Sequence, residues 1–145
     1  MRRMRQLIAA AAVMWCGAFL AVSAAGQQKP SAPSGWTIPP GAPNEKSPLP
    51  AGDATVAAGK ALFAKNCTRC HGAEGKGDGP DADHHHADHM NLTRAAGAAQ
   101  NPDGTVFHKI WNGRTNPKMP AFKEKLTREQ AWAIVAYVQT LRATK

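Results

Sequence analysis

The sequence predicts an all-α domain of about three to four helices, preceded by a proline-rich arm. Apolar residues recur at helical spacing in three segments, capping residues precede those segments, and no stretch alternates as a strand would. The chain of 145 residues has room for one domain. Its 43% hydrophobic and 19% charged residues are typical of a globular protein rather than a disordered one.

Two helices are expected in the first part of the domain. The first runs over residues 54–66, with Asp53 as its N-cap. The second is short and runs over residues 105–112, with Asp103 as its cap and Gly113 as its stop. Glycine- and proline-containing loops lie between them.

The last helix has the clearest pattern. The run Thr127-Arg128-Glu129-Gln130 is a capping box, in which the threonine and glutamine side chains serve each other's backbone N–H groups. Apolar residues then recur three and four positions apart, which predicts one buried face: Ala131, Ile134, Val135, Val138 and Leu141.

Residues 1–25 have the pattern of a secretory signal peptide. Three arginines precede an uncharged apolar run over residues 7–22, and small residues then offer a cleavage site after Ala24 or Ala25. The pattern predicts export to the periplasm. The alternative is an uncleaved N-terminal membrane anchor, because the run nearly reaches the ~20 apolar residues that span a bilayer.

Loss of this segment changes the charge balance. The whole chain has 18 Lys and Arg against 10 Asp and Glu, and without the three arginines the net charge falls from +8 to +5. No Lys/Arg-rich run remains, so nucleic acid is not an expected partner. Contact with a membrane is expected only if the signal is uncleaved.

Residues 26–52 form a proline-rich arm, ahead of a domain over residues 53–145. The arm holds seven of the eleven prolines and has no helical or alternating apolar period. Such a composition favours an extended, partly polyproline-like segment that cannot fold alone. It is either a tether or a strap across the domain, with Trp36 and Ile38 as its only plausible anchors.

The strongest chemical signal is Cys67-Thr68-Arg69-Cys70-His71, a C-x-x-C-H run at the end of the first predicted helix. The spacing lets two thiols on adjacent turns add to the two vinyl groups of a haem, while the next residue presents an imidazole to the iron. Three short helices with few aromatic residues bury little core, so such a domain needs a cofactor inside it.

Three other uses of the two cysteines compete with haem attachment. A thioredoxin-like dithiol expects a βαβ context, which is missing, and a zinc site expects a second ligand pair. A plain disulfide leaves His71 and the poor core unexplained. We therefore predict one covalently bound haem c, attached through Cys67 and Cys70, with His71 as the proximal axial ligand.

At these residues the chain resembles the class I c-type cytochromes, over about residues 53–143. The matching stretches are Gly59–Phe63, Cys67–His71, Asn116–Phe122 and Ile134–Val138. The resemblance implies a cytochrome c fold wrapped around one haem, with the first and last helices crossing.

The resemblance also assigns two supporting roles. Gly59 gives the close approach of the two crossing helices, beneath Phe63 and Tyr137. Pro80 is the best candidate for the loop proline whose carbonyl holds the ring of His71. The proline-rich arm and the histidine cluster described below depart from the family's familiar form, so no role is carried over to them.

The sixth iron ligand is predicted to be Met119. Pro117 and Pro120 stiffen the backbone on either side of it, and a rigid loop can hold a neutral thioether at the iron, which raises the reduction potential. Met90 is its rival, in a weakly patterned loop. Five histidines could in principle ligate haem as well: His84, His85, His86, His89 and His108. Position and resemblance favour Met119, which gives the His/Met pair expected of a soluble carrier.

The cluster over His84–His86 with His89 also suggests a transition-metal site. It sits in a polar loop with Asp81, Asp83 and Asp88, where nothing orients the rings. A solvated loop that binds metal weakly is the favoured interpretation, because histidine tracts are non-specific.

Two filled axial positions leave no open site on the iron, so the predicted function is one-electron transfer without catalysis. The protein is expected to be a periplasmic mono-haem electron carrier between redox proteins. The alternatives are a dedicated cytochrome subunit of a periplasmic dehydrogenase or terminal reductase, and a haem-based sensor or peroxidase with an open sixth site. Basic residues around Met119 predict an acidic docking face on the partner: Lys109, Arg114, Lys118, Lys123 and Lys125.

Overall fold

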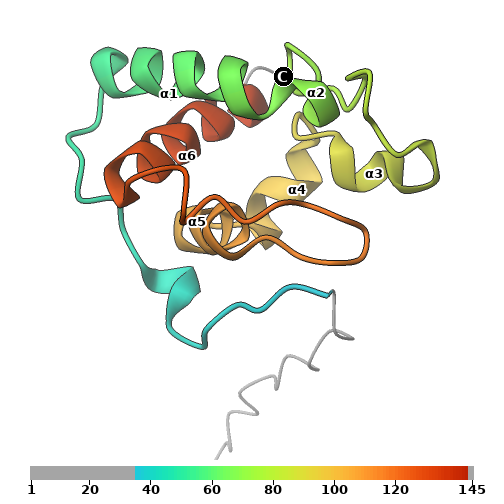
Figure 1. Cartoon of the computed structure of the whole chain (residues 1–145). Coiled ribbons are helices and arrows are strands. Elements are labelled where there is room, and N and C mark those ends of the chain that lie inside the picture. The colour runs from blue at the N-terminus through green and yellow to red at the C-terminus, as the bar shows by residue number, and fades with distance from the viewer. Residues whose placement is uncertain (1–34, 144–145) are drawn as a thin grey trace, which may run out of the picture. The chain divides into compact units, whose positions relative to one another are not determined.

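The computed structural model describes residues 35–143, which fold into helices joined by loops (Figure 1). The predicted signal peptide and the beginning of the arm lie outside the described residues. No strand occurs within residues 35–143, so the all-α fold class is confirmed. The elements in chain order are η1 (Ala42–Asn44), α1 (Asp53–Asn66), α2 (Thr68–His71), η2 (His84–His86), α3 (Ala87–Met90), α4 (Ala95–Gln100), α5 (Asp103–Asn112) and α6 (Arg128–Ala143).

Helices α1 and α6 pack against each other more extensively than any other pair, with α6 passing below α1 in Figure 1. Their closest approach is at Gly59, where an added Cβ would lie 1.9 Å from the carbonyl oxygen of Ala133. One turn later Phe63 meets Tyr137, with 5.2 Å between the ring centroids and an edge-on angle of 62°. The predicted helix crossing at Gly59 is thereby confirmed.

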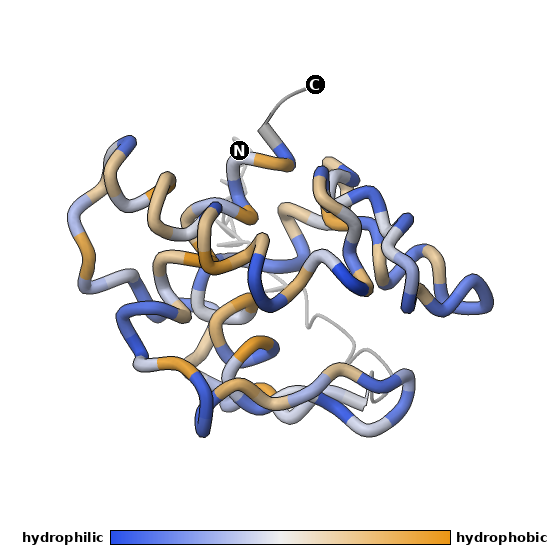
Figure 2. Tube along the Cα trace, turned by 45° about the horizontal axis from the view of Figure 1, so that its top comes forward, coloured by the Kyte–Doolittle hydropathy of each residue, from blue (hydrophilic) through white to orange (hydrophobic). Residues whose placement is uncertain are grey.

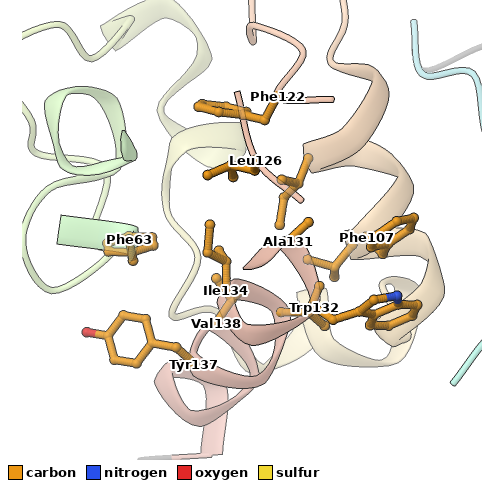
Figure 3. Packing of buried hydrophobic residues seen from close by; sticks show 12 residues of the cluster. Phe63, Phe107, Phe122, Leu126, Ala131, Trp132, Ile134, Tyr137 and Val138 are labelled. Carbon is orange, nitrogen blue, oxygen red and sulfur yellow. The ribbon is translucent and has the colours of Figure 1, made fainter. Parts of the chain in front are cut away.

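The hydrophobic core lies where α1, α5 and α6 meet the turn that precedes α6 (Figure 3). Phe63, Phe107, Ile134 and Val135 are its largest fully buried side chains. Phe107 stacks on Trp132 with 4.5 Å between centroids and 12° between planes. Along the chain the hydrophobic residues fall mainly within the helices, whereas the loops are mostly hydrophilic (Figure 2).

The ends of the helices follow from local capping, with one correction. At α6 the capping box is confirmed, since the backbone N–H of Gln130 donates to Thr127 Oγ1 at 3.2 Å and that of Thr127 donates to Gln130 Oε1 at 2.9 Å. Asp53 and Asp103 are not caps but the first residues of α1 and α5, where a carboxylate complements the helix dipole. Gly113 ends α5 with a φ of +61°.

The described part of the arm lies across the domain rather than away from it. Ala42 is fully buried, and its carbonyl oxygen packs so tightly on Gly104 that an added Cβ there would lie 1.8 Å away. Glu45 follows three residues after Ala42, and its Oε1 lies 2.8 Å from Nε2 of His108 on α5. These contacts hold the segment along α5, which it follows at the bottom of Figure 1.

The segment between α2 and α5 consists of turns and short helices. Arg69 donates two hydrogen bonds to the carboxylate of Asp81, at 2.7 and 3.0 Å, which fixes the first of these turns beside α2. The backbone N–H of Leu92 then donates to the carbonyl of Gly75 at 2.7 Å and brings the chain back. Among residues 35–143 no helix has the length and apolar character needed to cross a bilayer.

Candidate functional site

A cavity of about 450 Å³ lies beside the core, within the roughly 300–1,000 Å³ range of small-molecule sites. Its wall includes residues of the arm, of α1 to α6 and of the loop after α5. Three long helices supply much of its apolar surface: Phe63, Val106, Ile110, Ile134 and Val138. A smaller pocket of about 70 Å³ shares Cys67, His71 and Met119 with it and adds Cys70.

His71 is held in one orientation at this cavity. Its Nδ1 lies 2.7 Å from the carbonyl oxygen of Met90. Because a carbonyl only accepts, Nδ1 carries the hydrogen, and Nε2 keeps its lone pair for a ligand. Burial lowers the pKa of His71, against an opposing effect of the hydrogen bond to Met90. The ring is therefore a neutral imidazole at neutral pH, which is the form that binds metals.

The prediction for Pro80 is wrong, because the carbonyl at the His71 ring belongs to Met90. Pro80 is exposed, and the neighbouring backbone N–H of Asp81 donates to the carbonyl of Arg69 at 2.7 Å, on the outside of α2. The returning chain instead places Met90 against Gly77, where an added Cβ would lie 2.9 Å from Met90 C. No local sequence signal marks a contact that spans nineteen residues.

Cys67 and Cys70 are free thiols on consecutive turns. Cys67 directly follows α1, and its backbone N–H donates to the carbonyl of Phe63 at 2.8 Å. The backbone carbonyl of Cys67 accepts from the N–H of Cys70 at 3.2 Å. Cys67 lines both pockets and Cys70 the smaller one. Burial, with the nearby Cys70 thiol, raises the pKa of Cys67 to about 12. Cys67 is thus a protonated thiol, unlike the reactive thiolate of a redox enzyme.

Met119 is brought to both pockets by a closed loop after α5. The backbones of Arg114 and Met119 exchange two hydrogen bonds, at 2.9 and 3.0 Å, which form an isolated antiparallel bridge. Gly113 precedes the bridge, and an added Cβ there would lie 2.4 Å from the carbonyl oxygen of Met119. The N–H of Phe122 then donates to the carbonyl of Ile110 at 3.1 Å and ties the loop to α5.

Two of the rival ligands, Met90 and His108, are placed less favourably than Met119. Met90 is buried and lines only the smaller of the two pockets. Its carbonyl oxygen accepts the hydrogen bond from His71 Nδ1. His108 is engaged with Glu45, and His86 Nδ1 lies 2.8 Å from Asp83 Oδ2. His89 is the one histidine of the cluster that lines both pockets, as Met119 does, so the pockets alone do not separate these two, and the choice of Met119 rests on its closed loop and on the resemblance. Within residues 35–143 no group of three histidine, cysteine or acidic residues could hold a metal ion.

Two of the five basic residues predicted to form a docking surface point inward instead. Lys109 and Arg114 are half-buried and line the larger cavity, together with Arg94 and Arg142. Lys118, Lys123 and Lys125 are exposed, as a docking surface requires. The position of Lys109, three residues after Val106 and next to Ile110 on the apolar face of its helix, is a sequence signal for its burial.

The residues around the cavity fit a haem. The cavity combines an apolar wall with a neutral imidazole at His71 and a thioether at Met119. Two free thiols in C-x-x-C spacing lie at the same place, on Cys67 and Cys70. Neither a zinc site nor a dithiol enzyme accounts for this combination of soft ligands and apolar space.

Comparisons with known proteins identify the domain. The family model for cytochrome c matches residues 56–142, more than half of the chain. Among solved structures, the Kuenenia stuttgartiensis reducing HAO-like protein complex Kustc0457/Kustc0458 is similar, with a TM-score of 0.51 and 25% identity over 65% of this chain. The chain spans 46% of that protein's length. The comparison with curated proteins gives no significant match. The chain belongs to the cytochrome c family, whose members bind haem c covalently and typically carry electrons.

Proposed function

We propose that this cytochrome c carries single electrons between redox proteins of the periplasm, through one haem c. Cys67 and Cys70 would form the thioether links, and His71 and Met119 would be the axial ligands. When bound, the haem supplies a one-electron Fe(III)/Fe(II) couple. The protein supplies the ligands and the surroundings that adjust this couple.

One observation carries the proposal: His71 and Met119 line the same cavity. An imidazole and a thioether that both bind the iron leave no coordination site for a substrate. Such a protein exchanges electrons and does not transform a bound molecule. The His/Met pair also favours the ferrous state, as suits an electron carrier.

The chain's own residues limit how much the site changes when an electron arrives. Met90 fixes the His71 ring through the 2.7 Å hydrogen bond. The bridge between Arg114 and Met119 restrains the loop that carries the thioether that would bind the iron. Buried residues of α5 and α6 exclude water from the cavity wall. Side chains held in this way would need little reorganisation between the two oxidation states of a bound haem.

Exposed lysines support an acidic docking face on the redox partner. Lys118, Lys123 and Lys125 are exposed on and just after the loop that carries Met119. Charges of opposite sign on the partner would steer the encounter without adding much affinity. The export pattern of residues 1–25 supports the periplasm as the place of that encounter.

A dedicated subunit of a larger oxidoreductase is the second candidate. Its support is the similarity to a protein of a Kuenenia stuttgartiensis complex, of whose length this chain spans 46%. A dedicated subunit would elute with its oxidoreductase in gel filtration from the native periplasm. A free carrier would elute at the size of the cytochrome alone.

Mass spectrometry of the purified protein tests the proposal. After acid–organic extraction the polypeptide should keep the mass of one haem, and the tryptic peptide that contains Cys67 and Cys70 should carry it. Haem that extracts freely would refute covalent attachment, and a second haem would refute the mono-haem assignment.

A further inference from the structure

Four histidines lie in one short stretch of the chain, between α2 and α4. His84–His86 form η2, and His89 lies on α3, at the right of Figure 1. His86 is half-buried and the other three are exposed. In the sequence nothing orients these rings, which favours a solvated loop that binds metal weakly. The structure adds a carboxylate that orients one ring and a second ring that faces it.

His86 is held by Asp83. Its Nδ1 lies 2.8 Å from Asp83 Oδ2, and Asp83 Oδ1 accepts from the backbone N–H of His85 at 3.0 Å. The hydrogen bond from His86 lowers the pKa of Asp83, which is therefore ionised at neutral pH. Because a carboxylate only accepts, Nδ1 of the neutral ring carries the hydrogen and Nε2 keeps its lone pair. A carboxylate behind the imidazole is the usual support of a metal-binding histidine.

His89 faces His86 from about one turn further along the chain. The two rings are stacked, with 6.0 Å between centroids and 26° between planes, as suits residues three apart on a helix. Desolvation and the charges of Arg114 and His86 lower the pKa of His89. Its ring is therefore neutral at neutral pH, in the form that binds metals.

We propose that His86 and His89 bind one divalent transition-metal ion, with Asp83 as the carboxylate that orients His86. Imidazole nitrogen is a preferred ligand of Zn(II), Cu(II) and Ni(II), whereas Ca(II) and Mg(II) prefer oxygen. Water would complete the coordination, since no three-residue metal group occurs within residues 35–143. The site uses neither of the proposed axial ligands, so its failure leaves the proposed function unchanged.

The spacing of the two rings allows a shared ion. Each Zn–N bond is about 2.0–2.1 Å, so two imidazole nitrogens on a tetrahedral ion lie roughly 3.3 Å apart. His89 is exposed, so its ring can turn toward the ion while Asp83 keeps His86 in place. The negative charge of Asp83 offsets the repulsion between the ion and Arg114.

Calorimetric titration of the reduced holoprotein with Zn(II) tests the proposal, because Zn(II) has no redox chemistry of its own. His86→Gln and His89→Gln each remove a ligand and should lower the affinity by about tenfold or more. Asp83→Asn keeps both ligands but removes the orienting charge, and should lower the affinity by about 10–100-fold. His85→Gln is the matched control, since His85 is an exposed histidine of the same stretch outside the pair. Its affinity should stay within about twofold of the wild type.

Nuclear magnetic resonance of the histidine rings locates the ion independently. Zn(II) should shift the ring resonances of His86 and His89 and leave those of His84 and His85 unchanged. Equal losses of affinity in His85→Gln and His89→Gln, in proteins with the wild-type melting temperature, would indicate a non-specific histidine tract and overturn the site. Wild-type protein that binds Zn(II) no more tightly than Ca(II) would overturn it too. An unchanged affinity in Asp83→Asn would overturn the role of that carboxylate.

Discussion

Replacing Gly59 with alanine tests whether the crossing of α1 and α6 supports the site. An alanine Cβ would lie 1.9 Å from Ala133 O and 2.6 Å from Ala133 C, whereas ordinary contact begins at 3.4 Å. The helices would have to part by about 1.5 Å, since the obstacle is backbone and cannot rotate away. Overpacking costs about 1–3 kcal/mol, and a clash with backbone belongs at the upper end of that range.

The gain in helix propensity from glycine to alanine, about 1 kcal/mol, offsets part of this cost. We therefore expect a net loss of about 2 kcal/mol in the free energy of unfolding. For a domain of this size the melting temperature should fall by about 8–16 °C. Thermal unfolding of the holoprotein, followed by far-ultraviolet circular dichroism, measures the change.

Gly41→Ala is the control, because Gly41 has a φ of −82° and no atom within 4 Å of an added Cβ. It should change the free energy of unfolding by less than about 0.5 kcal/mol. If Gly59→Ala and Gly41→Ala have the same melting temperature, the close packing at the crossing does not stabilise the domain, and the reasoning fails.

Three further predictions concern the cofactor, the charged turn and the docking surface. Replacement of both motif cysteines by alanine should abolish cooperative unfolding, because the free energy of cofactor binding is part of the folding free energy; a well-folded apoprotein by near-ultraviolet circular dichroism would refute this. The hydrogen bonds from Arg69 lower the pKa of Asp81. Their stabilisation is therefore complete above the unfolded pKa of about 3.9 and is lost as the pH falls through the lower folded value. In urea titrations at several pH values, the stability of Asp81→Asn should depend less on acid than that of the wild type, and identical profiles would contradict the assignment. Charge reversal at Lys118 and Lys123 should slow electron transfer with the native partner. It should also weaken the dependence of the rate on ionic strength near 0.1 M, where the Debye length is about 10 Å. Charge reversal at Lys60 should change the rate less, and equal effects would show that this surface is not the docking face.

The features that local sequence predicts correctly are those with a local cause. The capping box at Thr127 and the apolar repeat behind it define α6 without help from other segments. Gly113 stops α5 because its φ of +61° suits glycine. The all-α class follows from such signals, and the C-x-x-C-H motif suggests its cofactor before any contact is known.

The features that the sequence does not predict depend on contacts between distant segments. The carbonyl that orients His71 belongs to Met90, and no sequence pattern around His71 or Met90 predicts this contact. The sequence offers Trp36 as one of two anchors for the arm, but its position over Arg114 depends on how the loop after α5 closes. The basic residues looked uniform in sequence, yet burial separates Lys109 from the exposed lysines that follow.

Carbon monoxide binding to the reduced holoprotein tests the central claim, a haem with both axial positions filled by His71 and Met119. The visible absorption spectrum of the reduced wild type should not change when carbon monoxide is added. Met119→Ala should bind the gas, and Met90→Ala should not, because Met90 contributes its carbonyl to His71 rather than a ligand. Binding by the wild type would indicate an open sensor or peroxidase site, and binding by Met90→Ala in place of Met119→Ala would show that the ligand has been misassigned.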